Sequence, residues 1–122
     1  MSKWFISHPS GGHRHTPIFF NALEQFAAEE KGRVELIHPR EKKEELHITK
    51  QDIASCDLVI AEVSIASTGS GIELGWANAA GKEVIAFYEG AEEASPAIQF
   101  VTKAIHPYIT EEHIILILKQ LL

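Results

Sequence analysis

The sequence has one cysteine, no long apolar run and no excess of positive charge. The single Cys56 rules out an intramolecular disulfide. We find neither a signal peptide nor an apolar run of about 18 residues, so we expect a cytoplasmic protein with no membrane partner. The formal net charge of -6 argues against a basic face that would bind a nucleic acid polymer or an anionic membrane.

A chain of 122 residues has room for one hydrophobic core, so we expect a single domain over residues 1–122. No internal repeat, low-complexity tract or linker divides it. The charged run at residues 40–45 predicts a solvated loop, because mixed charges at this density seldom bury.

Short apolar runs alternate with helix-like segments along the chain. Strands are predicted at residues 4–7, 34–37, 58–63 and 84–88, and helices at residues 17–30, 49–55, 71–80, 96–104 and 111–122. Residues 104–106 can add a short fifth strand. The order predicts an α/β fold: a flavodoxin-like (Rossmann-like) doubly wound open parallel sheet of four to five strands, with helices on both faces.

Three predicted loops leave the carboxyl ends of strands, and all are rich in Gly, Ser and His: residues 7–16, 64–70 and 89–95. Ligands of open α/β sheets bind beyond these ends. We therefore expect the functional site at this edge of the sheet.

Glu73 stands at the start of the helix that follows the third strand. It also completes a possible capping box, in which Ser70 caps the helix and Glu73 folds back to the Ser70 amide. Spacing alone therefore leaves Glu73 open between a helix cap and a catalytic carboxylate.

The glycines at residues 69–75 are similar to a dinucleotide fingerprint, but Leu74 occupies the place of its third glycine. These glycines more simply allow a small ligand to approach backbone amides. In the first loop, Gly11 and Gly12 form either an anion-binding nest or only a flexible turn.

His8, His13 and His15 crowd the first loop and raise the question of a metal site. Zinc requires a fixed spacing and a fourth ligand, and Cys56 is expected at the opposite edge of the sheet. We expect no bound metal and no cofactor, with imidazoles that face solvent or a ligand.

The stretch DLVIAEVSIASTGSGIELGWANAAGKEVIAFYEG, residues 57–90, resembles the nucleoside 2-deoxyribosyltransferase family. It is most similar to the branch of 2'-deoxynucleoside 5'-monophosphate N-hydrolases. Weaker similarity extends to FISHPSGGHRH near the amino end and to SPAI at residues 95–98. The resemblance implies that Glu73 of the ELG motif is a nucleophile that forms a glycosyl ester, which water or a second base resolves.

Ser67 stands six residues before Glu73, where transferases of this family carry an aspartate and the nucleotide hydrolases a serine. A hydroxyl can donate to a phosphate that an aspartate would repel, so the resemblance implies a hydrolase. It also implies that Ser95 reaches the phosphate from a neighbouring subunit, which would make the protein a homodimer.

The family carries its second catalytic acid on the helix before the third strand. An alignment without a gap places this acid at Thr49, and a helix shorter by three residues, nearly one turn, places it at Asp52. We assign Asp52 to proton transfer, with Asp57 in reserve. Ser10 stands where the hydrolases carry an arginine, so either Arg14 or the nearby histidines supply that charge, or a phosphate is not the ligand.

The sequence thus predicts an N-glycosidase that releases the base from a (deoxy)nucleoside 5'-monophosphate. Base exchange between deoxynucleosides, a nucleotide-binding module without catalysis, and a dinucleotide-binding protein are the alternatives. The residues expected to bind the substrate lie on the first strand and in the three loops: Trp4, Ser7, His8, Gly11, Gly12, Ser67, Gly69 and Ser95.

Overall fold

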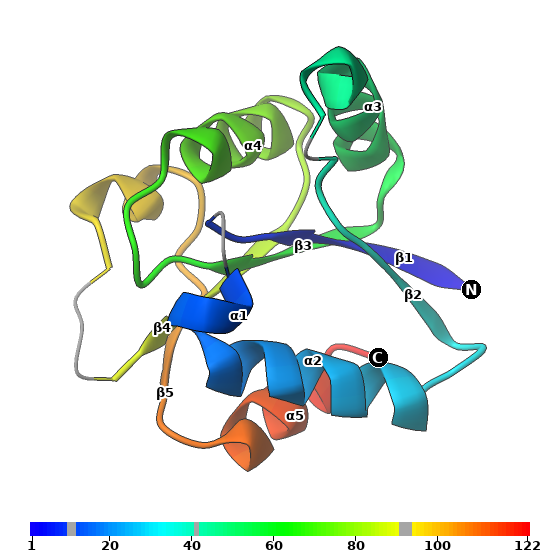
Figure 1. Cartoon of the computed structure of the whole chain (residues 1–122), viewed down its shortest axis with the longest axis vertical. Coiled ribbons are helices and arrows are strands. Elements are labelled where there is room, and N and C mark those ends of the chain that lie inside the picture. The colour runs from blue at the N-terminus through cyan, green and yellow to red at the C-terminus, as the bar shows by residue number, and fades with distance from the viewer. Residues whose placement is uncertain (10–11, 41, 91–93) are drawn as a thin grey trace.

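The computed structural model describes residues 1–9, 12–40, 42–90 and 94–122, without the side chains of residues 12 and 13. A parallel sheet of five strands lies between two layers of helices (Figure 1). The strands are β1 (Ser2–Ser7), β2 (Val34–Ile37), β3 (Leu58–Glu62), β4 (Val84–Glu89) and β5 (Ile105–Tyr108). Their order in the sheet, β2-β1-β3-β4-β5, confirms the predicted flavodoxin-like α/β fold.

Two long helices cover each face of the sheet (Figure 1). One layer contains α2 (Pro17–Glu29) and α5 (Glu111–Gln120), and the other contains α3 (Leu46–Ser55) and α4 (Thr68–Ala79). Three short elements lie in the connections: α1 (Gly12–His15), and the 3-10 helices η1 (Lys43–Glu45) and η2 (Pro96–Phe100).

The side chains of β1 alternate between the two layers, as the pleat of a strand requires. Trp4 and Ile6 enter the core under α2 and α5. Phe5 enters the core under α3 and α4. Ser7 has the same parity as Phe5, so it faces α4, and it is completely buried. A polar side chain thus ends a strand whose inner positions are otherwise apolar.

The helix predicted at residues 96–104 is wrong, because only η2 forms there and the chain then enters β5. The Thr102 hydroxyl donates to the Val84 carbonyl at the start of β4, which ties this segment to the sheet edge. The predicted short fifth strand is confirmed as β5, two residues longer at its carboxyl end than expected. Part of the predicted charged loop forms η1.

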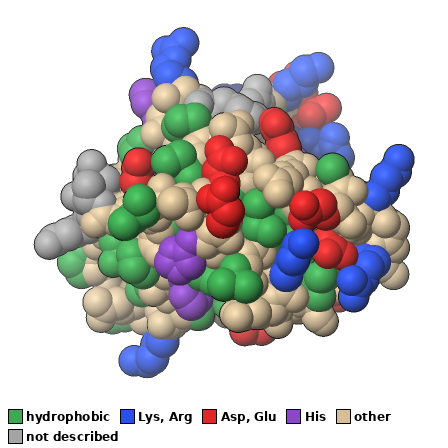
Figure 2. Space-filling model, turned by 90° about the horizontal axis from the view of Figure 1, so that it is seen from below, with side chains coloured by type: hydrophobic (Ala, Val, Ile, Leu, Met, Phe, Trp, Pro, Cys, Tyr) green, Lys and Arg blue, Asp and Glu red, His purple; other side chains and the backbone are tan. Residues whose placement is uncertain are grey.

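The outer face of α2 and α5 carries mixed charges. Figure 2 shows acidic side chains near the centre of this face and Lys and Arg side chains around its rim. Lys119 of α5 pairs with Glu29 of α2 at 2.8 Å and so links the two helices. In the described part of the chain, no helix combines the length and apolar character needed to cross a bilayer.

Candidate active site

Ser7 and Glu73 meet at the carboxyl edge of the sheet. The Ser7 hydroxyl donates a hydrogen bond to Glu73 Oε1 at 2.8 Å, from the end of β1 to the second turn of α4. The hydroxyls of Ser7 and Ser70 lie 3.0 Å apart. A hydroxyl has only one hydrogen, so Ser70 donates to Ser7 whenever Ser7 donates to an ionised Glu73.

Glu73 does not cap its helix, and of the two alternatives left open by the sequence the capping box is excluded. Helix α4 begins at Thr68, three residues earlier than expected, and its N-cap is Ser67 rather than Ser70. The Ser67 hydroxyl accepts a hydrogen bond from the Ser70 amide at 3.3 Å. The Glu73 carboxylate, one turn further along, is therefore available for a role other than capping.

Burial raises the pKa of the Glu73 carboxyl to about 7, although the Ser7 hydrogen bond acts in the opposite direction. Near neutral pH the group therefore exists in both protonation states. A carboxyl group whose pKa is raised by burial is a feature common at catalytic sites.

Asp52 lies on α3, in the same helical layer as Glu73. Its Oδ2 atom lies 3.9 Å from Nε of Arg40, and it is the one buried side-chain oxygen or nitrogen found without a hydrogen bond among the described residues. Thr49, one turn earlier, accepts a hydrogen bond from the Arg40 amide at 2.9 Å. Thr49 and Asp52 thus both face Arg40, as their spacing on one helix face predicts.

Two residues considered at this site lie elsewhere. Asp57 precedes β3 at the amino edge of the sheet, where its carboxylate accepts a hydrogen bond from the Lys3 amide at 2.8 Å. Trp4 is 3% exposed and stacks on Phe26 with ring centroids 5.4 Å apart, in the opposite core from Ser7. The structure therefore brings neither residue to Glu73.

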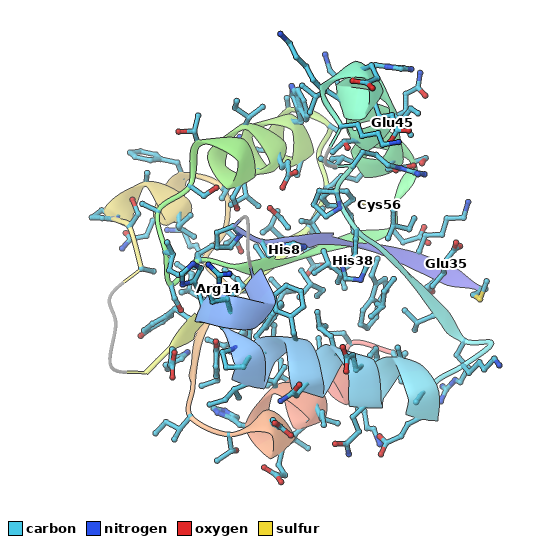
Figure 3. The ribbon with its side chains drawn as sticks, viewed as in Figure 1. His8, Arg14, Glu35, His38, Glu45 and Cys56 are labelled. Carbon is cyan, nitrogen blue, oxygen red and sulfur yellow. The ribbon has the colours of Figure 1, made fainter. Side chains whose placement is uncertain are left out.

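His8 follows β1 and lies beside His38, which follows β2 (Figure 3). The His8 ring also contacts Phe20 edge to face, with centroids 4.8 Å apart. Nδ1 of His8 lies 3.0 Å from the Pro9 carbonyl. A carbonyl can only accept, so Nδ1 carries the proton and Nε2 is the nitrogen left for a ligand.

The remaining predicted residues are distributed over the loops of the same edge. Gly69 is exposed in the first turn of α4, and Gly12 begins α1, whereas Gly11 lies outside the described residues. Arg14 is exposed on α1 (Figure 3). Ser95 is exposed and caps η2, where its hydroxyl accepts from the Ala97 amide at 3.4 Å.

Sequence reasoning missed two features of this edge. The charged run predicts a solvated loop for Arg40, although the position of this residue just beyond β2 is a signal for the site. Glu62 ends β3 completely buried, and its carboxylate accepts hydrogen bonds from the Tyr108 hydroxyl and the Ser64 amide. An acid at the end of an otherwise apolar strand was the available signal.

Acids, histidines and the cysteine do not gather into a metal site in the described residues: no group of three or more could hold an ion. The His13 side chain lies outside that description. The chemistry that this edge offers is that of a partly buried carboxylate with a raised pKa, hydroxyl donors, imidazoles and two arginines.

Comparisons with known proteins give a match at the level of structure. No known protein-family profile matches the chain, and no curated protein matches it. The structure of a CMP N-glycosidase, BcmB, from Clostridium botulinum is similar, with a TM-score of 0.71 and 23% sequence identity over 98% of this chain and 99% of that chain. The chain therefore shares the fold of a nucleotide N-glycosidase over essentially its whole length.

Proposed function

We propose that this protein is a nucleotide N-glycosidase of the nucleoside 2-deoxyribosyltransferase type. It would hydrolyse the bond between base and sugar in a (deoxy)nucleoside 5'-monophosphate. The observation that carries this proposal is the Glu73 carboxylate, partly buried at the carboxyl edge of the sheet and held by Ser7. The shared fold with BcmB supports the same class of substrate.

In the proposed reaction, Glu73 attacks the anomeric carbon as the bond from that carbon to the base breaks. The base leaves with the bonding electrons and takes up a proton. Water then attacks the anomeric carbon of the glutamyl ester, which regenerates the carboxylate and releases the sugar 5-phosphate. Retention of configuration follows, because each of the two displacements inverts the carbon.

Asp52 is proposed to assist the proton transfer. A buried carboxylate oxygen without a hydrogen bond is unusual in a folded protein. Arg40 is about half exposed and approaches this oxygen only to 3.9 Å. A substrate that displaces Arg40 would itself donate to Asp52 the hydrogen bond that this oxygen lacks.

The phosphate is proposed to bind between the first loop and the start of α4. Ser67 uses an oxygen lone pair for its cap, so its hydrogen remains available to donate to an anion. The amino end of a 12-residue helix also favours negative charge. Arg14, His8, Gly69 and the first-loop amides of Gly11 and Gly12 complete the proposed site.

A homodimer is part of the proposal, with Ser95 reaching the phosphate of the other subunit. Three large apolar side chains are exposed on the elements after β3 and β4: Ile65, Ile72 and Phe100. A partner subunit that packed against these elements would remove this apolar area from water.

The test is to incubate the purified protein with ribo- and deoxyribonucleoside 5'-monophosphates and the matching nucleosides, and to measure free base by chromatography. CMP and dCMP come first, because BcmB acts on CMP. We expect base release from at least one monophosphate, and none with Glu73→Gln. Release from nucleosides alone, transfer of the sugar to an added second base in place of hydrolysis, or full activity of Glu73→Gln would refute the proposal.

A further inference from the structure

Ser7 makes both of its hydrogen bonds to side chains of α4. It donates to Glu73 at 2.8 Å and pairs with Ser70 at 3.0 Å, and its own side chain is completely buried. Its single hydrogen is committed to Glu73 when that residue is ionised. A substrate therefore cannot receive a hydrogen bond from Ser7 unless the contact with Glu73 is broken.

The contact with Ser7 also distinguishes the two oxygens of Glu73. Oε1 accepts the Ser7 hydrogen bond. In the described residues no hydrogen bond reaches Oε2, whereas Oε1 is occupied by Ser7. Oε2 is therefore the oxygen left to approach an anomeric carbon.

We propose that Ser7, supported by Ser70, is a positioning residue that holds Oε1 of Glu73 and directs Oε2 toward the sugar, rather than a residue that binds the substrate. This inference rests on the proposed function, in which Glu73 is the nucleophile. It replaces the expectation that Ser7 contacts the nucleotide.

The hydrogen bond also favours the ionised, nucleophilic form of Glu73, against the effect of burial. Two charged groups on the neighbouring helix have partners of their own. On α3, which packs against α4, the Lys50 ammonium lies 5.7 Å from the centre of the Trp76 ring, and Asp52 pairs with Arg40. On β1, the neighbouring His8 turns its Nδ1 to the Pro9 carbonyl. Ser7 is thus the group in the described structure that lowers the pKa of Glu73.

The first experiment needs no substrate. The Glu73 carboxyl is titrated by NMR in protein labelled with carbon-13 glutamate, for the wild type, Ser7→Ala, Ser70→Ala and the control Ser2→Ala. Ser2 is exposed at the other end of the same strand. We expect the pKa, about 7 in the wild type, to rise by about one pH unit in Ser7→Ala, by less in Ser70→Ala, and not in Ser2→Ala. An unchanged pKa in Ser7→Ala would overturn the proposal.

The second experiment separates positioning from binding, with the monophosphate that the wild type cleaves. In Ser7→Ala the acid limb of the kcat/KM profile should move to higher pH by the same amount as the carboxyl titration, and kcat should fall at unchanged KM. A raised KM with an unmoved acid limb would instead make Ser7 a substrate ligand. If the wild type cleaves no nucleotide, the proposed function fails, while the carboxyl titration still decides whether Ser7 controls Glu73.

Discussion

The Tyr108 hydroxyl at the end of β5 donates a hydrogen bond to the buried Glu62 carboxylate at the end of β3, and so joins two strands that flank β4. Burial raises the pKa of both groups, and for Tyr108 the neighbouring Glu62 adds to the effect. The pair lies on the side of the sheet opposite Glu73, among the residues packed under α2 and α5. Its position indicates a structural role that fixes the carboxyl ends of three strands.

Removing the Tyr108 hydroxyl should therefore destabilise the fold. Tyr108→Phe leaves a completely buried carboxylate with one hydrogen bond fewer, which costs about 1–3 kcal/mol. Chemical denaturation would measure this loss. Tyr88→Phe is the matched control, because Tyr88 is half-buried on the neighbouring β4 and no hydrogen bond of its hydroxyl is found in the described structure. Equal stability of the two variants would contradict a structural role for the pair.

Removing the ionisable group of Glu73 should instead stabilise the fold, because the surroundings of this side chain disfavour its charged form. Its pKa is about 7 in the folded protein against an ordinary value of 4.5. As the pH rises between these values, the unfolded chain loses this proton while the folded protein retains it, so the free energy of unfolding falls. Glu73→Gln cannot ionise, so it should be more stable than the wild type by about 1–3 kcal/mol at pH 8 and nearly equal at pH 4.

Thermal unfolding at the two pH values, measured together with base release, would test this trade-off between stability and activity. Glu83→Gln is the matched control, because Glu83 is exposed just before β4 and the same change there removes a carboxylate that lies in solvent. We expect no pH-dependent gain in Glu83→Gln. A Glu73→Gln variant that loses stability at pH 8 would indicate a structural role for the carboxylate instead.

Much of the sheet was predictable because its strands are short apolar runs, whose pattern is local in the sequence. The start of α4 was not, because Ser67 and Ser70 are both good caps and only the exit of the chain from β3 decides between them. The bonds from Ser7 to Glu73 and from Tyr108 to Glu62 span 66 and 46 residues. No local pattern encodes such pairs, so the proposal that Glu73 is a nucleophile came from family resemblance, and its hydrogen-bond partner Ser7 came only from the structure.

Asp52 should matter for turnover more than for binding. Asp52→Asn keeps the size of the side chain but removes its ability to transfer a proton, so we expect kcat to fall by about 100-fold or more with little change in KM. Asp57→Asn is the matched control at the amino edge of the sheet, where the amide oxygen can still accept from the Lys3 amide. A larger loss in Asp57→Asn than in Asp52→Asn would reverse the assignment of the acid.

A site shared between subunits predicts complementation. In a dimer that combines a Glu73→Gln chain with a Ser95→Ala chain, one site regains both Glu73 and the other subunit's Ser95. Mixing the two impaired proteins after reversible dissociation should restore about a quarter of the wild-type activity. Sedimentation must show a dimer under the same conditions. Activity that stays at the level of the separate variants, or a monomeric active protein, would exclude a shared site.

Ser67 offers the sharpest test of the phosphate. Ser67→Asp and Ser67→Asn both preserve a good N-cap for α4, so both should fold with stability close to that of the wild type. Only Asp adds a negative charge beside the proposed phosphate site. We therefore expect Ser67→Asp to raise KM for the monophosphate at least about tenfold above that of Ser67→Asn, because like charges at close range repel. The matching nucleoside carries no phosphate, so its kcat/KM should differ little between the two variants. Equal KM values for the monophosphate in Asp and Asn variants would place the phosphate elsewhere on the protein.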